Sequence, residues 1–191
     1  PLAGPISVGV VLVNKEELKK LKFDLKHLKV GDSKKLSPKQ REAVFEKVLT
    51  LPYLRYACAF ESNKIIDKFG IEEATRRAFD DCLLKLKNKP EIILYDGNRP
   101  VDKKLNIKQI PIIKGDDKVF IISLASIIAK VTRDRYMVKI AKKYPKYGFE
   151  IHKGYGTKKH MEAIGRNGLC SLHRRSYCKG IKHGNNVQSF G

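Results

Sequence analysis

Short segments rich in apolar and β-branched residues alternate along the chain with longer segments of helical character. Residues 6–13, ISVGVVLV, are bounded by Pro and Asn and are typical of a buried strand. Because strands alternate with helices, the fold class we predict is an α/β or mixed α+β domain. The predicted strands are residues 6–13, 54–62, 91–98 and 107–113.

The helices between these strands are predicted from their own start and end signals. Ser37 can cap a helix that has Pro38 at its first position. Residues 71–87 carry acids early and lysines late, as the helix dipole favours. The middle of residues 117–144 is apolar nearly all round, so a long and deeply buried helix is expected there.

A chain of 191 residues fits one domain of ordinary size. We expect a single domain over residues 1–181, followed by a polar and disordered tail at 182–191. The sequence shows no apolar run of about 20 residues and no signal peptide, so we expect a cytoplasmic protein without a membrane partner.

Basic residues outnumber acidic ones by 40 to 20 and are spread through every segment, which gives a formal net charge of +20. A charge of this size indicates a polyanionic partner, with binding that weakens steeply as salt rises. The plainer interpretation is a soluble protein from a lysine-rich proteome. Nucleic acid is the partner that the charge favours.

One stretch spaces two cysteines and two histidines as C-x2-H-x4-C-x4-H, which mimics a zinc knuckle with the ligand types exchanged. No CxxC pair anchors this stretch and its other residues are largely basic, so reduced and unbound thiols are favoured over structural zinc. The four residues are Cys170, His173, Cys178 and His183.

Asp96 lies where the predicted strand 91–98 ends in Asp-Gly-Asn. Side chains at the carboxyl ends of strands in open α/β sheets emerge from a rigid scaffold into the usual ligand crevice. An Asp-Gly turn without any function explains the same residues equally well. Asp96 is therefore a candidate site residue with two open interpretations.

Asp134 shares a helical stripe with Ile127, Val131 and Val138, at spacings of four, three and four residues. This stripe predicts a carboxylate on the inner side of the helix. A buried carboxylate is costly unless it meets a cation, a donor or a metal. A simple ion pair with Lys130, four residues earlier, is the structural alternative.

Two inward carboxylates in a strongly basic chain suit phosphodiester hydrolysis by divalent cations, in which acids hold the metal and basic residues hold the substrate backbone. Two ions some 3.5–4 Å apart usually need more than two carboxylates. No third acid is equally well placed in the sequence. Asp32, Asp116 and Asp117 are predicted in loops, and Glu150 has no clear inward orientation.

The stretch HKGYGT places Tyr155 between two glycines, where the backbone approaches a ligand closely and the ring is free to stack. Aromatic rings among lysines are a common device for binding nucleic acid. A tyrosine that only packs a tight loop is the alternative. Lys34 and Lys35 in DSKKLS are candidate phosphate contacts, although surface lysines are common.

Together these segments resemble the ribonuclease HII family, in the family's order and over nearly the whole chain. AKVTRDR and HKGYGT are specific, and DSKKLS is moderately so. The matching stretches are PLAGP (1–5), GDSKKLS (31–37), LYDGN (94–98), ASIIAKVTRDR (125–135), YPKYGFEIHKGYGT (144–157) and HRRSY (173–177).

The resemblance implies a ribonuclease H-like α/β fold, with a mixed five-stranded sheet flanked by helices and a C-terminal helical extension. It implies an endonuclease that cuts RNA in RNA–DNA hybrids, and also cuts 5′ to ribonucleotides embedded in duplex DNA. It further implies Mg²⁺ or Mn²⁺ as the metal and action as a monomer.

The resemblance also assigns roles to particular residues. Asp96 and Asp134 match two of the family's four metal-binding acids, and Tyr155 matches the tyrosine that stacks at the RNA–DNA junction. Lys34 and Asn98 fall in motifs that line the substrate groove. A non-catalytic protein that binds hybrids is the alternative.

In the family, PLAGP normally follows a strand and the motif Asp-Glu-Ala-Gly-Arg-Gly, which supplies two metal-binding acids and a loop that recognises the 2′-hydroxyl. Neither precedes Pro1 in this sequence. We expect that the sequence is truncated, and that the chain as given lacks the activity that those two acids support.

Overall fold

The computed structural model describes residues 1–102 and 105–181, and the predicted tail at 182–191 lies outside the described residues. The chain divides into two compact units, which are described separately. The sheet unit comprises Ser7–Phe60 and Thr75–Thr132. The terminal unit comprises Pro1–Ile6, Glu61–Ala74 and Arg133–Gly191. The single domain expected over residues 1–181 stays a prediction.

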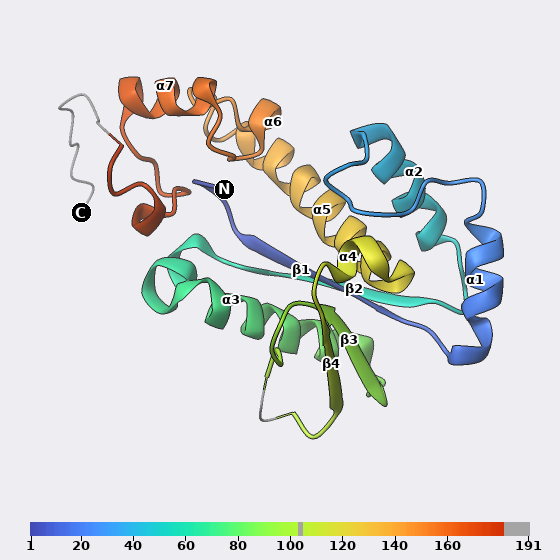
Figure 1. Cartoon of the computed structure of the whole chain (residues 1–191). Helices are drawn as coiled ribbons and strands as arrows, with labels where there is room; N and C mark the ends of the chain where they lie inside the picture. The colour runs from blue at the N-terminus through green and yellow to red at the C-terminus, as the bar shows by residue number, and fades with distance from the viewer. Residues whose placement is uncertain (103–104, 182–191) are drawn as a thin grey trace. The chain divides into compact units, whose positions relative to one another are not determined.

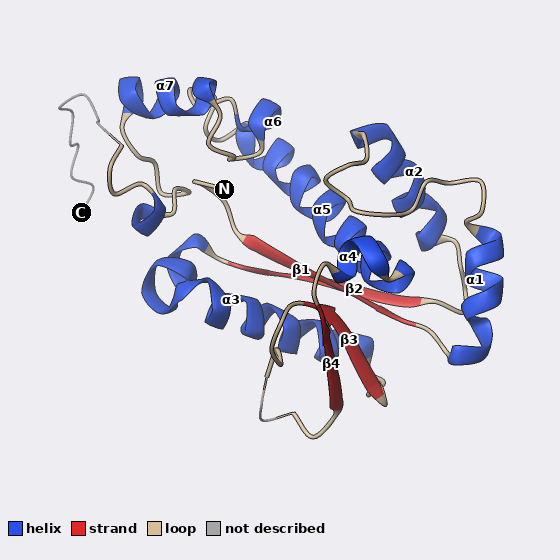
Figure 2. Ribbon diagram, viewed as in Figure 1, coloured by secondary structure: helices blue, strands red, loops and turns tan. Residues whose placement is uncertain are grey.

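Helices and strands alternate through the first two thirds of the chain, and helices and loops follow (Figure 2). The elements are β1 (Ile6–Leu12), η1 (Lys15–Glu17), α1 (Leu18–Asp24), α2 (Pro38–Leu49), β2 (Arg55–Glu61), α3 (Asn63–Leu86), β3 (Ile92–Asp96), β4 (Lys108–Ile112), α4 (Gly115–Lys118), α5 (Phe120–Ala141), α6 (Phe149–His152), α7 (Lys158–Asn167) and η2 (Arg175–Tyr177).

Alternate residues of β1 pack against two different helices of the sheet unit. Val8 and Val10 join a cluster with Cys82 of α3. Val11 packs instead against the cluster that contains the buried residues of α5. A Cβ on Gly9 would lie 2.3 Å from the carbonyl oxygen of Ala125, so glycine lets α5 approach the strand closely. The two faces of the strand predicted at residues 6–13 therefore pack against two different helices.

The helix predicted to begin at Ser37 is confirmed as α2. The Ser37 hydroxyl accepts from the Gln40 amide at 3.2 Å, and the Gln40 side chain accepts from the Ser37 amide at 2.8 Å. Such a capping box satisfies two amides that the first turn leaves without helical partners. Val44 and Val48 of α2 then bury themselves in the core of the sheet unit.

The strands form two separate pairs, β1 with β2 and β3 with β4, so the five-stranded sheet implied by the resemblance is not seen among the described residues (Figure 1). Strands β3 and β4 are parallel. Among the described strands β3 pairs only with β4, and it is less buried than the sequence predicts. Ile93 is buried, whereas Ile92 and Leu94 are 48% and 39% exposed.

Two predicted helices have different bounds in the structure. The segment 117–144 divides into the four-residue α4 and the long α5, separated by the extended residue Val119. The segment 71–87 is the second part of α3, which begins at Asn63 and is interrupted at Gly70, where φ is +85°. Only glycine adopts this backbone geometry without strain.

The core of the terminal unit is built around Phe149, which is fully buried. Its ring stacks on that of Tyr147 at a centroid distance of 5.5 Å and meets the His160 ring edge-on. Met137 of α5 and Ala3 close the same cluster. Among the described residues, no helix combines the length and apolar character needed to cross a membrane.

Candidate functional site

Asp96 is the last residue of β3 and its carboxylate is fixed by the start of α4. The Gly115 amide donates to Asp96 Oδ1 at 2.9 Å. A Cβ on Gly115 would lie 2.8 Å from Ile122 Cδ1 and 3.3 Å from Asp96 Cα, so glycine allows this close approach. Asp96 is exposed, as expected for a side chain at a strand end.

Asp116 follows Gly115 directly and is a site residue that the sequence did not single out. It is only 8% exposed, and its carbonyl accepts from Ser123 Oγ at 2.7 Å. Lys34 Nζ lies 3.4 Å from Asp116 Oδ2. The sequence predicted Asp116 in a loop, whereas it lies in the short helix that packs on the end of β3. An Asp directly after a Gly that follows an apolar strand was the available signal.

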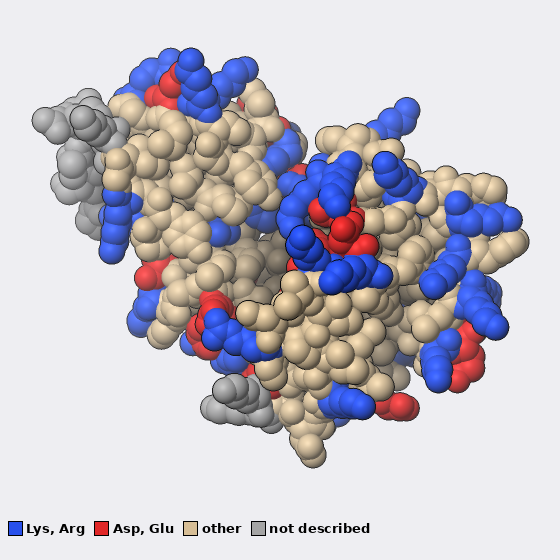
Figure 3. Space-filling model, in the orientation of Figure 1, with Lys and Arg blue, Asp and Glu red and all other residues tan. Residues whose placement is uncertain are grey.

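Lys34 lies in the electric field of several carboxylates of the sheet unit. Asp116 contributes most to raising the pKa of Lys34, and Asp32 and Asp96 raise it further. The neighbouring Lys35 pairs with Asp117 at 3.0 Å. Figure 3 shows acidic side chains gathered over α4 with basic side chains around them. The structure therefore brings Asp96, Asp116 and Lys34 to one place.

The carboxylates of Asp96 and Asp116 fit the donor chemistry of a hard divalent cation, since Mg²⁺ takes one or two carboxylates and completes its shell with water and phosphate oxygens. Within residues 1–102 and 105–181, no group of three or more metal-binding side chains is found. Two carboxylates are enough to hold one metal ion, but two metal ions usually need more carboxylates than that.

Asn98 is exposed in the turn after β3, two residues beyond Asp96. A side chain there is accessible to a ligand that approaches the strand end. Its predicted contact with substrate stays a prediction.

Asp134 belongs to the terminal unit and lies beside the buried face of α5 rather than on it. Ile127 and Val131 are buried as predicted, but Val138 is 44% exposed and Asp134 is intermediate. The predicted stripe is wrong in its second half because the buried face of α5 continues through Met137. The role of Asp134 as a metal ligand stays a prediction.

Arg133, one residue earlier, is the charged side chain that α5 buries, at 5% exposure. Its Nε and Nη2 donate to the carbonyls of Pro5 and Ala3, both at 2.9 Å. Its Nη1 donates to the carbonyl of Lys153 at 3.0 Å. Burial lowers the pKa of Arg133, and the nearby Tyr155 and Asp134 oppose that change. No pattern in the sequence had singled out Arg133.

Tyr155 is 40% exposed, and its ring lies over Arg133 with 5.4 Å between the Cζ atom and the ring centroid. The preceding Gly154 has φ +80°, and its carbonyl accepts from the Leu2 amide at 2.7 Å. A Cβ on Gly154 would lie 2.5 Å from the Ala3 carbonyl oxygen. Glycine is thus required at position 154, in agreement with the position of Tyr155 between two glycines in the sequence.

Three buried histidines support this loop from the core of the terminal unit. His160 Nδ1 lies 2.9 Å from the Tyr155 carbonyl, and its Nε2 lies 3.1 Å from His173 Nε2. The Cys170 amide donates to His173 Nδ1, so the proton of His173 is on Nε2 and is donated to His160. His173 thus has both nitrogens engaged, while His183 lies outside the described residues.

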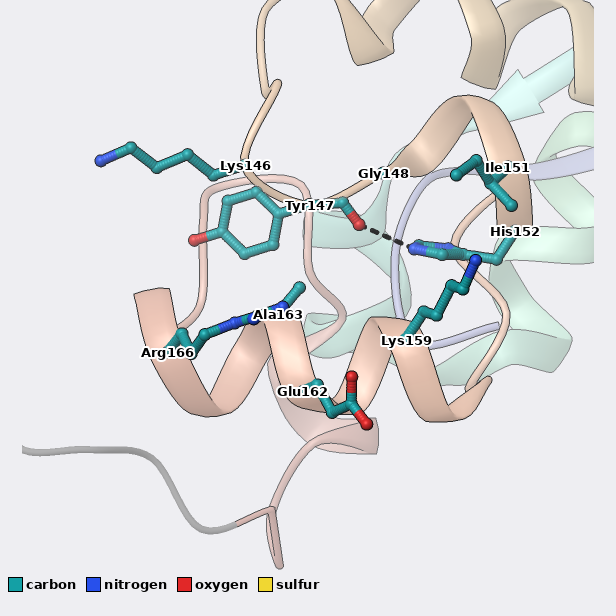
Figure 4. A pocket seen from close by; sticks show the side chains of 9 residues that line it. All are labelled: Lys146, Tyr147, Gly148, Ile151, His152, Lys159, Glu162, Ala163 and Arg166. Carbon is teal, nitrogen blue, oxygen red and sulfur yellow. Dashed lines mark hydrogen bonds between the residues drawn. The ribbon is translucent and has the colours of Figure 1, made fainter.

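His152, the third histidine, accepts from the Gly154 amide and donates through Nε2 to the Tyr147 carbonyl at 2.7 Å. Figure 4 shows this bond at the wall of a pocket of about 310 Å³. Lys146, Lys159 and Arg166 also line the pocket. Each histidine ring is therefore held in one orientation by its hydrogen bonds.

An α/β fold with paired carboxylates beside a lysine and an aromatic loop on a buried arginine is typical of an enzyme that acts on nucleic acid. The family model for ribonuclease HII matches residues 1–180. The chain therefore belongs to the ribonuclease HII family and is a ribonuclease H enzyme.

Relatives of this family cover most of the chain. Ribonuclease HII of Caldicellulosiruptor bescii is 42% identical over 181 residues, which are 95% of this chain and 82% of the relative. Ribonuclease HII of Endomicrobium trichonymphae is 45% identical over 177 residues, which are 93% of this chain and 80% of the relative.

Solved structures agree with this assignment. The ribonuclease H2 of Pyrococcus horikoshii matches with a TM-score of 0.73 at 30% identity, over 92% of this chain and 88% of that one. The ribonuclease HII in a complex with PCNA from Archaeoglobus fulgidus shares the fold, with a TM-score of 0.72 at 24% identity over 99% of this chain and 92% of that one. The expected ribonuclease H-like fold is confirmed.

Proposed function

We propose that this enzyme cuts the RNA strand of RNA–DNA hybrids, and incises duplex DNA 5′ to embedded ribonucleotides, by metal-dependent hydrolysis. The observation that carries the proposal is the approach of Asp116 to Asp96 through Gly115, with Lys34 paired to Asp116 and within the electric field of Asp96. This chemistry needs at least carboxylates to hold a cation and, beside them, a lysine to hold the phosphate.

Asp96 and Asp116 are proposed to hold Mg²⁺ or Mn²⁺. Such a metal supplies a nucleophilic water and stabilises charge on the phosphate. A solved structure of Bst-RNase HIII is a complex with Mn²⁺. That protein shares the fold of this chain, with a TM-score of 0.60 at 14% identity. Asp134 is the further ligand proposed from the sequence, which would raise the number of carboxylates above two.

The chain's own side chains would bind and orient the substrate. The charge of +20 favours a nucleic-acid backbone, and Lys34 is 77% exposed at its side chain, so it remains accessible to a phosphate. The exposed ring of Tyr155 is proposed to stack on the nucleotide at the RNA–DNA junction. Asn98 is proposed to contact the same strand near the scissile bond.

Hybrid binding without cleavage is the second candidate, favoured by the small number of carboxylates found together among the described residues. We further propose that the protein acts as a monomer in the cytoplasm. Light scattering during size-exclusion chromatography tests the monomer, and a dimer at micromolar concentration would contradict it.

The test is cleavage of a labelled DNA duplex that carries one ribonucleotide, and of a uniform RNA–DNA hybrid, in Mg²⁺ or Mn²⁺ and in a chelator. A metal-dependent cut 5′ to the ribonucleotide supports the proposal. Binding of both duplexes without any cut supports the second candidate. Equal affinity for these duplexes and for plain DNA, together with no cleavage, would contradict both candidate functions.

A further inference from the structure

We propose that Arg133 is the positioning residue for Tyr155, with its buried guanidinium backing one face of the ring so that the other face is presented to the ribonucleotide. This inference rests on the proposed function, because it assigns a task to the ring that binds the junction. The two residues come from α5 and from the loop before α7. Their contact places the Arg133 Cζ atom 5.4 Å from the centroid of the Tyr155 ring.

The guanidinium of Arg133 is held rigidly. Three of its nitrogens each donate to a different backbone carbonyl, those of Ala3, Pro5 and Lys153, at 2.9–3.0 Å. Because the guanidinium is planar, bonds to three fixed acceptors determine both its position and the tilt of its plane. The plane under Tyr155 is therefore set by backbone from two separate parts of the chain.

The backbone of Tyr155 is fixed as firmly as the guanidinium below it. Its amide donates to the His152 carbonyl at 2.9 Å, and its carbonyl accepts from the Thr157 amide at 2.8 Å. His160 also bonds to that carbonyl, and His173 holds His160 in the required tautomer. The contact with Arg133 restricts the side-chain torsions of Tyr155.

The two faces of the contact differ in their access to solvent. Arg133 is 5% exposed, whereas Tyr155 is 40% exposed. A ring that stacks on a buried cation gains more than a ring on a hydrated one, since the cation has already lost its water. Stacking on one side leaves the opposite face of the ring for a base or a sugar.

Arg174 supplies a matched control in the same unit. It is 3% exposed, and it donates to the carbonyls of Gly4 and Pro5 at 2.9 and 3.0 Å, so it clasps the same backbone segment as Arg133. Its guanidinium lies over Tyr177 instead, at 5.4 Å. Replacing Arg174 removes bonds to the same backbone segment and keeps the guanidinium that lies over Tyr155. Arg174 also interacts electrostatically with Arg133 and Tyr155, so the control is a lysine substitution, which keeps the positive charge.

The experiment measures the dissociation constants of a duplex with one ribonucleotide and of the all-DNA duplex, in a chelator so that no cleavage occurs. The ratio of the two constants is compared among wild type, Arg133→Lys, Arg174→Lys, Tyr155→Leu and Arg133→Lys/Tyr155→Leu. In Arg133→Lys we expect the preference for the ribonucleotide duplex, given by this ratio, to fall about 3–10-fold, as for the loss of part of one stacking contact. In Arg174→Lys we expect the ratio to stay at its wild-type value. In the Tyr155→Leu background, Arg133→Lys should cause no further fall.

The outcomes separate the two proposals. Absence of any preference in the wild type overturns the inference, whereas the proposed function is tested separately by cleavage of the same duplexes in Mg²⁺ or Mn²⁺. The inference alone is overturned if the preference is unchanged in Arg133→Lys or falls equally in Arg174→Lys. It is also overturned if Arg133→Lys lowers the preference further in the Tyr155→Leu background. Should Arg133→Lys fail to fold, the Arg133 Nε–H resonance is followed in the wild type, and its failure to shift on adding the ribonucleotide duplex overturns the inference.

Discussion

The ammonium group of Lys34 lies 3.4 Å from the carboxylate of Asp116, which α4 buries beside the end of β3. The two residues are 82 positions apart in the sequence. Their contact joins the loop before α2 to the strand end that carries Asp96. Lys34 thereby offsets negative charge that a metal ion would otherwise have to neutralise, and its exposed end remains available to a phosphate.

Replacing Lys34 by Gln should weaken binding to hybrid duplexes about equally for all sequences, because a phosphate contact carries no sequence information. The slope of log K against log salt should fall in magnitude by about 1. Fluorescence anisotropy at several salt concentrations measures both quantities. Lys20→Gln, which removes a lysine paired with Glu17, is the control. Identical slopes for the two variants would argue against a phosphate contact at Lys34.

Acid should destabilise the protein through His160. Burial lowers the pKa of His160 to about 4 in the folded state, against an ordinary value of 6.5. As pH falls, the His160 imidazole therefore binds a proton in the unfolded chain before it does so in the folded chain. The contribution of neutral His160 to the free energy of unfolding is present above pH 6.5 and is lost as pH falls from 6.5 to 4. The loss should amount to about 2–3 kcal/mol.

Urea unfolding between pH 4 and 8 measures that loss, and His160→Gln should flatten the part of the curve between pH 6.5 and 4. The neighbouring His152 also lowers the pKa of His160, although less than burial does. A wild-type curve that is flat over this interval would show that His160 is not held neutral.

Gly154→Ala should destabilise the terminal unit by about 2–3 kcal/mol, because it combines a positive φ with a Cβ that would lie 2.5 Å from the Ala3 carbonyl oxygen. Gly165→Ala is the matched control. Gly165 lies in α7 with nothing within 4 Å of its Cβ position, so alanine there should stabilise by about 0.5–1 kcal/mol. Thermal unfolding of the two variants gives the comparison, and equal shifts would contradict the tight loop.

Local signals in the sequence predicted the elements well where one residue type decides the outcome. Ser37 and Pro38 start α2, and the buried strand predicted at residues 6–13 is found as β1 (Ile6–Leu12). The pairing of strands was less accessible, because it depends on contacts between distant segments. The exposed residues Ile92 and Leu94 of β3 illustrate this, since their apolar character alone indicated a buried strand.

The site was only partly accessible from the sequence for the same reason. Asp96 is at a strand end as predicted, but the importance of Asp116 follows from a four-residue helix that helical periodicity cannot reveal. On α5, the stripe through Asp134 predicted an inward carboxylate, whereas the helix buries Arg133 instead. A buried arginine bonded to carbonyls is visible only when the chain segments that supply them have been brought together.

The most direct measurement is Mn²⁺ binding, by electron paramagnetic resonance, to the wild type and to four variants in which one Asp is replaced by Asn. Removing Asp96 or Asp116 should weaken binding by more than the 10–100-fold typical of outer-shell changes, with a matching loss of cleavage. Asp117→Asn should bind like wild type, since Asp117 pairs with Lys35 at the surface.

Asp134→Asn is the fourth variant. A loss equal to that of Asp96→Asn would extend the site to the ligand predicted from the sequence. Unchanged binding would leave Asp134 as a countercharge for Arg133. Mn²⁺ affinity that is the same in Asp116→Asn as in Asp117→Asn would contradict the central claim, that Asp96 and Asp116 together hold the metal.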